Sequence, residues 1–600
     1  MSDSPRADLP LELYGERLEQ RRSERRRRER QDFRLSTLRG VVALIGVASC
    51  AGTLAASGGA AAVLVLSLLA FGALALIHER VARASERAAR AAAYYEAGRA
   101  RLNDEWAGRG VAGEAFLDPA HPYAADLDLF GRGSLFERLC TARTRSGEEV
   151  LAAWLLAPAP IGEVGERQAA VEELRPRLDL REDLAVLGGE ARRSVDSSTL
   201  RDWVQAPVDA LPAVFRALAV PLALAALAAL WNWLVWGASP YAFVAAFIAV
   251  SVLGQWARPR TSAILRGIDQ PVRDLATLSD LLSRLERERF DAPRLRRLWE
   301  AFGTGEARAS LEIARLRRLV ERRDSKHNLF FAPFAFLLSW DIHIAAAVAQ
   351  WRRRAGGSVA ASLRALAEVE ALCAFAAYAF ENPADPFPAF EDGAPRFEAT
   401  GLGHPLIAES RAVRNDVRFD AERRLLVVSG SNMSGKSTLL RAIGLNAVLA
   451  QAGAPVRAHH LTLSPLTVGA SIRIVDSLQE GRSRFYTEIK RVRQVIDMAG
   501  GRPWLLFLLD EIFHGTNSAD RVVGAEAVVR TLVERGAIGL VTSHDLAITE
   551  IADDLAPAAA NVHFEDHLEG DTIAFDYRLK PGPVTKSNAL ALMRAVGLSV

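Results

Sequence analysis

The sequence is poor in cysteine and has no excess of charge of one sign. Its three cysteines, Cys50, Cys140 and Cys373, lie far apart and lack the paired spacing of metal ligands. This pattern argues against a disulfide framework, gives no support to a zinc site and favours reducing surroundings. The 74 lysines and arginines are balanced by 72 aspartates and glutamates, for a net charge of +2. Bulk charge therefore does not indicate a nucleic-acid partner, and any basic surface must be local.

Tandem repeats and low-complexity tracts are also missing, apart from a general enrichment in alanine. The chain is nevertheless long, at 600 residues. A domain usually takes about 100–200 residues, so we expect two or three domains. An apolar share of 50% is typical of an enzyme that carries a few apolar spans and not of a polytopic transporter.

An uncharged stretch runs from Val41 to Ile77. It is about twice the length that crosses a bilayer once, and a Ser-Gly-Gly turn at 57–59 divides it into spans of about 41–56 and 60–77. We therefore predict a transmembrane hairpin over 41–77. The alternative is a pair of buried helices in a protein core.

Two further apolar stretches follow. The first, from about Ala217 to Ala257, is broken at 237–240 and carries tryptophans where interfacial anchors are expected, so it predicts a second hairpin. Buried core helices are again the alternative. The other stretch, from Asn328 to Trp351, contains Pro333. A fifth crossing there would place the C-terminal part of the chain outside the cytoplasm, so we predict a buried helix.

Flanking charge predicts the orientation of the hairpins. Nine arginines at 21–39 precede the first span, whereas the turns within the hairpins carry neither lysine nor arginine. Both chain ends should therefore face the cytoplasm, which predicts a multi-pass protein of the cell (inner) membrane in contact with the lipid bilayer. The arginine run at 21–30 could instead bind nucleic acid, but beside a membrane span contact with anionic lipid is the commoner role.

The rest of the chain divides into a helical part and an α/β part. Leucines at three-to-four-residue spacing in 126–200 and 263–325 predict long amphipathic helices. A segment rich in proline and aspartate at 381–396 predicts a linker, and beyond it short β-branched runs alternate with helical patterns. The predicted fold class is therefore α plus α/β and multidomain, with the hairpins attached to the helical part.

A glycine-rich loop marks the start of the α/β part. The apolar strand Leu425–Val428 leads into the loop, and a helical run follows it, which is the context that a P-loop requires. In such a loop backbone amides wrap the phosphates, Lys436 reaches the β- and γ-phosphate oxygens, and Ser437 offers its hydroxyl to Mg²⁺. The sequence predicts that ATP is bound by Gly430, Ser431, Asn432, Met433, Ser434, Gly435, Lys436, Ser437 and Thr438.

Two later strands end in residues suited to ATP hydrolysis. The apolar run 504–509 ends in Asp510, predicted to hold Mg²⁺, and Glu511, predicted to polarise the attacking water. An apolar run that ends in Asp-Glu is common by itself, but after a P-loop in the same domain it is strong support for a site of ATP hydrolysis. His544 follows the strand 538–543, where an imidazole can sense the γ-phosphate; an incidental histidine is the alternative. We predict an Mg²⁺-dependent ATPase with Glu511, His544 and Lys436 as its catalytic residues.

Four motifs, in this order, resemble the MutS family: GSNMSGKST at 430–438, GRSRFYTE at 481–488, LLDEIFHGTNSADR at 508–521 and TSHD at 542–545. The likeness extends to GHPLI at 403–407, Arg414-Asn415-Asp416 and 570–598, and to lever-type helices at 134–158 and 167–171. It covers about 126–200 and 265–600. The resemblance implies an ABC-like ATPase domain attached to lever helices.

The same resemblance implies a homodimer that encloses ATP between its ATPase domains. Ser483 would reach across to the partner's ATP, and Asn517 and Asp520 would lie in the loop that faces the dimer partner. The alternative for Ser483 is an ordinary helix N-cap, and both roles can hold at once.

The sequence departs from the family pattern in the parts that would read DNA. The mismatch-reading domain, the DNA-encircling clamp and the terminal helix-turn-helix dimerisation element are expected to be missing. The aromatic residue that would stack on adenine, expected just before Asn415, is replaced by Ala412-Val413. Arg414 is the remaining candidate for stacking.

We therefore expect five segments: an Arg-rich segment at 1–40, a hairpin at 41–77, a connector at 78–125, a lever core at 126–390 containing the hairpin 217–257, and an ATPase domain at 391–600. The predicted function is a membrane-anchored ATPase that couples ATP hydrolysis to binding of mismatched or structured DNA in repair. A nucleotide-switched scaffold for a protein partner is one alternative. An ABC-like transport ATPase is another, disfavoured by short spans without charge and by the lack of an LSGGQ signature.

Overall fold

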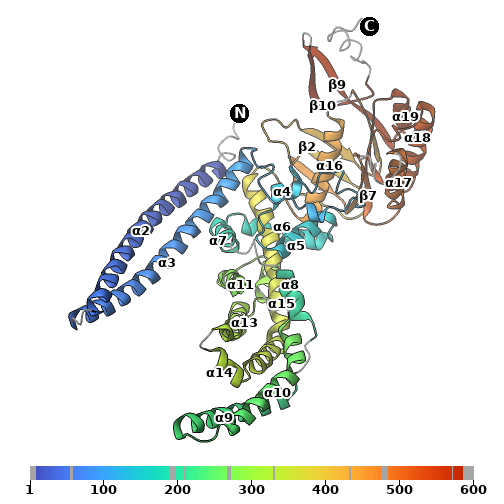
Figure 1. Cartoon of the computed structure of the whole chain (residues 1–600). Coiled ribbons are helices and arrows are strands. Elements are labelled where there is room, and N and C mark those ends of the chain that lie inside the picture. The colour runs from blue at the N-terminus through green and yellow to red at the C-terminus, as the bar shows by residue number, and fades with distance from the viewer. Residues whose placement is uncertain are drawn as a thin grey trace.

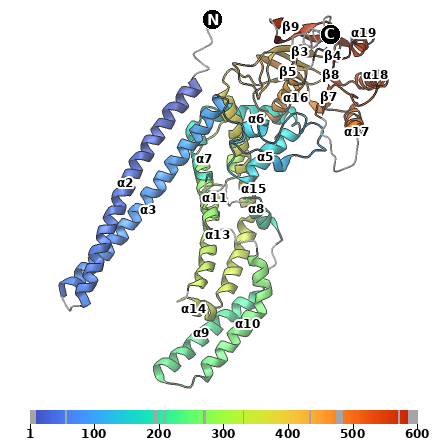
Figure 2. The same cartoon turned by 45° about the horizontal axis from the view of Figure 1, so that its top comes forward.

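The protein consists of long helices and, towards its C-terminal end, two β-sheets, as the computed structural model in Figure 1 shows. The structure describes residues 9–54, 58–189, 197–207, 211–266, 272–328, 331–431, 434–473, 484–569 and 572–584. The predicted combination of helical and α/β structure is confirmed. The α/β part lies at one end, and two helical hairpins extend away from it in both views (Figures 1 and 2).

The first hairpin consists of α2 (Leu9–Leu54) and α3 (Gly58–Leu102). The arginine-rich residues and the apolar span thus share one continuous helix. Near the body of the protein the hairpin is fixed by Tyr14 and Tyr95, which are almost fully buried, and the Tyr95 hydroxyl donates to Glu182 Oε2 at 2.5 Å. Towards its turn the hairpin is apolar and exposed, as at Leu44 and Leu66.

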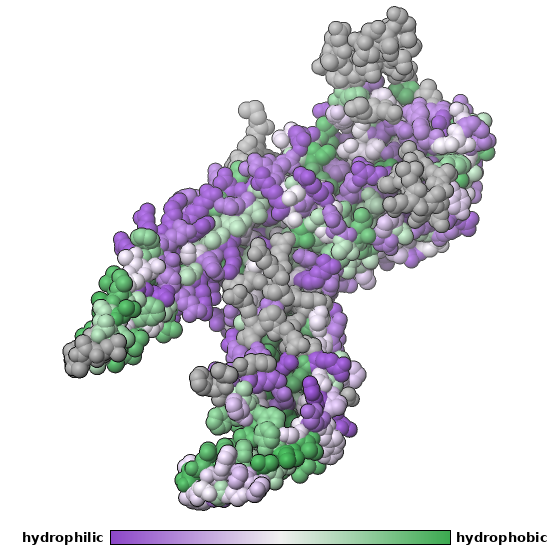
Figure 3. All heavy atoms as spheres, in the orientation of Figure 1, coloured by the Kyte–Doolittle hydropathy of each residue, from purple (hydrophilic) through white to green (hydrophobic). Residues whose placement is uncertain are grey.

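The second hairpin consists of α9 (Ala213–Trp236) and α10 (Tyr241–Leu265), with Gly237 in a left-handed conformation at φ 66° where α9 ends. Trp231, Trp236 and Tyr241 are exposed near its turn. Within the described residues, four helices are long and apolar enough to cross a membrane, and they are the helices of these two hairpins. Figure 3 shows hydrophobic surface gathered on the free end of each hairpin.

The segment from Asn328 to Trp351 is not one buried helix, as the sequence had suggested. The six-residue α14 (Ala332–Leu337) begins around Pro333, and Ser339, at φ 49°, separates it from α15 (Trp340–Glu381). α14 packs against the second hairpin, with the Phe336 ring 5.0 Å from that of Phe247. Its phenylalanines are about half exposed, whereas the first turns of α15 are largely buried. The physical reason is the left-handed residue, which turns the chain between the two helices.

Shorter helices pack around α15. The leucines of α11 (Val272–Leu285) at 275, 278, 281, 282 and 285 are buried, so the predicted amphipathic pattern is confirmed. The Thr144 side chain caps α5 (Arg145–Leu156) by accepting from Gly147 N. The remaining elements are η1 (Glu114–Phe116), α4 (Leu135–Leu139), α6 (Ile161–Leu174), α7 (Leu178–Gly188), α8 (Ser197–Gln205), α12 (Pro293–Glu300), η3 (Gly305–Ala307), α13 (Ala309–Asp324) and η4 (Ser325–His327).

The described strands form two sheets. One has the order β1-β5-β2-β3, from β1 (Ala389–Phe390), β2 (Phe397–Leu402), β3 (Asn415–Phe419) and β5 (His460–Leu463). The other has the order β10-β9-β4-β8-β7-β6, from β4 (Leu425–Ser429), β6 (Leu466–Ser471), β7 (Trp504–Asp510), β8 (Ile538–Ser543), β9 (Ala559–Glu569) and β10 (Thr572–Pro581). All its neighbours pair in parallel except β9 and β10.

This second sheet places the carboxyl ends of its central strands at one edge. Ser429 of β4 is level with Ser543 of β8, and Asp510 of β7 is level with Thr542. The helices of this part are α16 (Lys436–Ala452), α17 (Arg484–Asp497), α18 (Ser518–Glu534), η6 (Leu546–Thr549) and α19 (Glu550–Asp554). In a sheet of this kind, ligands bind at the carboxyl edge.

A buried polar network joins the end of α15 to the α/β part. Arg457, in the segment between α16 and β5, places Nη1 3.2 Å from both carboxylate oxygens of Asp385 and 3.3 Å from Asn382 Oδ1. Its backbone N–H donates to Asn446 Oδ1 at 2.6 Å. The Asp385 side chain is completely shielded from solvent. Because both charges are buried, the position of α15 and that of the α/β part depend on each other.

Candidate nucleotide-binding site

The loop between β4 and α16 lies at the carboxyl edge of the sheet. Its last residue before the helix, Gly435, has φ 104°, a conformation that L side chains rarely adopt. A β-carbon there would also lie 3.1 Å from the Tyr577 ring. Asn432 and Met433 fall outside the described residues, so their predicted contacts with ATP stay predictions.

Lys436 opens α16 and turns back over the loop. Its ammonium group donates to Gly430 O at 2.9 Å and to Ser431 O at 2.8 Å, and it lies 3.5 Å from Glu511 Oε1. Burial lowers the pKa of Lys436, although both Glu511 and Asp510 oppose that shift. Backbone carbonyls thus hold the cation beside the helix N-terminus, which is where a phosphate group would be expected to bind.

Ser437 and Asp510 meet at the same place. The Ser437 hydroxyl donates to Asp510 Oδ2 at 2.5 Å, and the Thr542 hydroxyl donates to Asp510 Oδ1. A serine hydroxyl and a carboxylate are hard oxygen ligands of the type that Mg²⁺ takes together with water and phosphate oxygens. The residues present therefore fit the predicted magnesium site.

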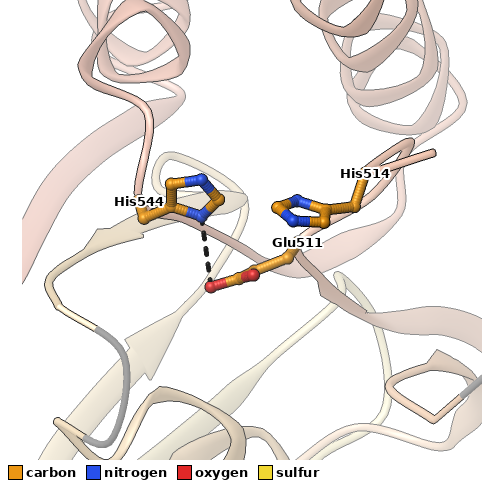
Figure 4. A group of neighbouring side chains, drawn as sticks. All are labelled: Glu511, His514 and His544. Carbon is orange, nitrogen blue, oxygen red and sulfur yellow. Dashed lines mark ion pairs between the residues drawn. The ribbon is translucent and has the colours of Figure 1, made fainter. Parts of the chain in front are cut away.

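Glu511 follows at the tip of β7 in an unusual backbone conformation, with φ 44°. Its N–H lies 3.2 Å from Thr542 O and 3.1 Å from Thr542 Oγ1. The side chain places Oε1 3.3 Å from His544 Nδ1 (Figure 4). The structure thus brings together Lys436, Ser437, Asp510, Glu511 and His544, which the sequence predicted as neighbours from three separate motifs.

A cavity of about 780 Å³ opens beside these groups. This is within the size range of small-molecule sites. Thr438 and His514 line it as well, and its apolar wall is formed by Leu402, Ile407, Ala412, Val413, Ile472, Phe564 and Tyr577. His404 also lines the cavity; burial lowers its pKa to about 4, so its imidazole is neutral at neutral pH. The lining of the cavity therefore includes both charged and apolar side chains.

The sequence did not identify Tyr577, an aromatic side chain of the apolar wall. Tyr577 lies in an irregularity of β10 at φ 52°, and it is held there by Asn415. The Asn415 amide donates to Tyr577 O at 3.0 Å and accepts from Leu579 N at 2.7 Å. The only hint in the sequence was an aromatic residue within the downstream motif at 570–598.

Arg414, the stacking candidate from the sequence, points elsewhere. Its guanidinium donates to Gly401 O at 2.9 Å and forms an ion pair with Glu409 at 2.9 Å. It is not among the residues that line the cavity. Because its donors are engaged in these contacts, we replace Arg414 by Tyr577 as the candidate for stacking on a base.

Asn517 and Asp520, which were predicted to face a dimer partner, are not brought into this cavity. Asn517 caps α18, accepting from Asp520 N at 2.8 Å and donating to Asp520 Oδ2 at 2.7 Å. Neither residue lines the cavity. Ser483 lies outside the described residues, and α17 begins directly after it at Arg484. Their roles towards a partner's ATP stay predictions.

Glu488 is a second residue that sequence reasoning passed over. It belongs to α17, is buried, and lines the cavity. Its Oε1 accepts from the N–H of Phe513, two residues after Glu511. This contact ties the helix that follows Ser483 to the loop that carries the catalytic candidate.

Sequence comparison shows which proteins this chain resembles. A family model described as "MutS domain V" matches residues 426–599, from β4 onwards. The chain is 33% identical over 248 residues to "DNA mismatch repair protein MutS" of Natronomonas pharaonis, a match that covers 39% of this chain and 27% of that protein. Residues 426–599 belong to the MutS family. The resemblance seen in the motifs is thereby confirmed.

Two further MutS proteins match the chain to a similar extent. "Endonuclease MutS2" of Thermus thermophilus is 34% identical over 219 residues, covering 35% of this chain and 27% of that protein. "DNA mismatch repair protein MutS 2" of Halobacterium salinarum is 35% identical over 243 residues, a match that covers 39% of this chain and 27% of that protein. The chain thus spans about a quarter of the length of the MutS relatives it matches.

Proposed function

We propose that this MutS-family protein is a membrane-anchored ATPase that uses Mg²⁺. The observation that carries the proposal is the contact of 2.5 Å between the Ser437 hydroxyl and Asp510, which line the cavity together with Lys436 and Glu511. A metal ligand pair, a phosphate-binding cation and a carboxylate base are the parts that ATP hydrolysis needs.

Each residue has a defined role in this proposal. Lys436 exchanges the carbonyls of Gly430 and Ser431 for the phosphate oxygens of ATP. Ser437 and Asp510 would hold Mg²⁺, which would neutralise charge on the phosphates. Glu511 accepts a proton from the attacking water, and His544, 3.3 Å from it, fixes the orientation of its carboxylate.

We place the adenine base against the apolar side chains that line the cavity. The exposed ring of Tyr577 and the side chains of Val413 and Ile407 line it. Stacking of a base on an aromatic ring contributes about 1–3 kcal/mol. In the proposed homodimer, Ser483 and Asn517 of each subunit complete the ATP site of the other, with 391–600 as the ATPase domain and 126–390 as the lever core.

Membrane anchoring rests on the two hairpins. Large apolar side chains that would be buried in a soluble protein are exposed at their free ends, among them Leu44, Leu66, Leu234 and Trp236. Both free ends lie on the side away from the α/β part (Figures 1 and 3). We therefore place both hairpins in the inner membrane and the ATPase domain in the cytoplasm.

Coupling to DNA is the finer part of the proposal. The relatives carry names of mismatch repair proteins and of an endonuclease, and the family model matches the region from β4 onwards. We propose that ATP binding moves the lever helices and changes the affinity for mismatched or branched DNA. Because the family model matches only this C-terminal region, a nucleotide-switched scaffold for a protein partner is the second candidate.

Hydrolysis is tested with the full chain in detergent. Lys436→Ala should abolish ATP binding, whereas Glu511→Gln should keep binding and lower kcat by about 100-fold or more. Glu511→Gln should also accumulate an ATP-bound dimer, measured by light scattering after chromatography. Glu526→Gln, which removes an exposed carboxylate on α18, is the matched control. A Glu511→Gln protein that hydrolyses ATP at the wild-type rate would refute the assigned base.

DNA coupling is tested by fluorescence anisotropy. The full chain is titrated onto duplex, mismatched and branched DNA with and without ATP, at several salt concentrations. We expect affinity that falls steeply with salt and changes with nucleotide. DNA binding that responds neither to salt nor to nucleotide would exclude the DNA function and favour the scaffold function. This result would not bear on the proposed ATP hydrolysis.

A further inference from the structure

Two histidines flank the candidate base at the carboxyl edge of the sheet. Glu511 and His514 follow β7, and His544 follows β8 (Figure 4). One ligand atom from each of the three side chains lies within 4.8 Å of the others. The two imidazole rings are 5.1 Å apart, and neither His514 nor His544 is buried. The ATPase proposal assigns no role to His514.

The backbone around the three residues is fixed by contacts that need no ion. Glu511 N donates to Thr542, and Phe513 N donates to the buried carboxylate of Glu488. On the β8 side, Asp545 N donates to Ser543 Oγ at 2.9 Å, and Arg521 pairs with the Asp545 carboxylate at 2.5 Å. The three ligand candidates are therefore held close together before any cation arrives, which lowers the cost of binding one.

Two imidazoles and one carboxylate form a ligand set for a transition metal. Imidazole nitrogen suits Zn²⁺, Co²⁺ and Ni²⁺, whereas Mg²⁺ prefers hard oxygen ligands. Three protein ligands with a fourth position open to water are also the arrangement of zinc sites that stay accessible. In such a site ligand atoms about 2.1 Å from the metal are about 3.4 Å apart. Side-chain rotation of the exposed histidines can close the remaining distance.

We propose that Glu511, His514 and His544 form a site for Zn²⁺ or a similar transition-metal ion, distinct from the magnesium ligands Ser437 and Asp510. The ion would inhibit hydrolysis, because it occupies the carboxylate lone pairs that accept a proton from water. This inhibitory role rests on the proposed ATPase function, whereas binding of the ion does not. Lys436, 3.5 Å from Glu511 Oε1, opposes the ion electrostatically. Its ammonium is also held by two backbone carbonyls, which reduces that opposition.

Binding is tested on the full chain, purified in detergent through a tag without histidine. Zn²⁺ is titrated calorimetrically in the presence of excess Mg²⁺ and without nucleotide, and Co²⁺ is titrated by its visible absorption. We expect one ion per chain, and His514→Asn should weaken binding by about tenfold or more. His460→Asn is the matched control, because His460 is an exposed histidine on β5 that lies outside the cluster. Unchanged affinity in His514→Asn, or no saturable binding beside Mg²⁺, would overturn the site.

Inhibition is measured separately as the ATPase rate against Zn²⁺ concentration. We expect the concentration for half inhibition to rise about tenfold or more in His514→Asn and to stay unchanged in His460→Asn. An ion that binds with the expected dependence on His514 but leaves the rate unchanged would overturn the inhibitory role. A protein that hydrolyses no ATP even without Zn²⁺ would instead refute the proposed function, while the binding titration still decides the metal site.

Discussion

The buried pair of Asp385 and Arg457 should be a point where a small change has a large effect. Asp385 follows α15 and Arg457 belongs to the α/β part, so Asp385→Asn removes a charge at the joint while keeping the side-chain shape. The Arg457 guanidinium would then be buried without its main counter-charge. We expect Asp385→Asn to destabilise the α/β part.

The magnitude follows from the surroundings of Arg457. Removing one partner of a buried ion pair costs about 3–5 kcal/mol. Arg457 keeps Asn382 Oδ1 at 3.3 Å and Glu409 at 3.6 Å, but the Glu409 side chain is 60% exposed and contributes little. We therefore expect the lower end, about 3 kcal/mol. For a unit of about 200 residues this lowers Tm by about 6–12 °C.

The assay is thermal unfolding in detergent, followed by tryptophan fluorescence. Asp385→Asn and Arg457→Met are measured alone and together. If the two residues interact, the loss of unfolding free energy in the double variant should be smaller than the sum of the two single losses, by about 1 kcal/mol or more. Glu526→Gln breaks an exposed pair with Arg530 and should change stability by less than about 0.5 kcal/mol. The reasoning would be refuted if Asp385→Asn lowered Tm no more than Glu526→Gln does. It would also be refuted if the free-energy losses of the two single variants simply added up in the double variant.

Three further predictions concern single sites. Burial raises the pKa of Glu370 from 4.5 to about 7, so the folded state binds more protons than the unfolded state between these values, and stability should fall as pH rises through them. This pH-dependent part of the stability amounts to about 3 kcal/mol at most, and Glu370→Gln should remove it. Parallel curves of Tm against pH for the wild type and the variant would contradict the prediction. Tyr577→Ala should weaken ATP binding by about 5-fold to 150-fold in a fluorescent-nucleotide titration while Tyr577→Phe does not, because the stacking ring is what matters; equal affinity of both variants would exclude stacking. In a Cys50→Ala background, Ser239→Cys at the second turn should react with an impermeant maleimide from outside intact cells, whereas Ser262→Cys should react only after permeabilisation; the reverse pattern would contradict the topology.

The local parts of the site were predictable from the sequence because neighbours in the chain are neighbours in space. Lys436 and Ser437 follow the glycine-rich loop directly, and Asp510 lies at the end of a strand that could be recognised by its apolar run. Parallel strands then place Asp510 level with Thr542, just before His544. The family pattern added the order of the motifs, and the comparisons confirmed the family.

Long-range and conformational features were beyond the sequence. Tyr577 lies 162 residues after Asn415, its hydrogen-bond partner, and it reaches the cavity only because β10 is irregular there. The break at Ser339 depends on one left-handed residue, which no periodic pattern of apolar residues reveals. Arg414 was a reasonable candidate by type, but its contacts with Gly401 and Glu409 direct it away from the cavity.

α15 has a consequence for how far motion can travel in this protein. Its 42 residues form a rod of about 63 Å at about 1.5 Å per residue. One end of the rod packs against the second hairpin, and the other is joined to the α/β part through Asp385. If the rod pivots by about 10° at the α/β end, its far end sweeps about 11 Å, by the geometry of a helix of this length. In the proposed function, the length of this helix would therefore turn a small rotation beside the nucleotide site into a larger displacement at the second hairpin.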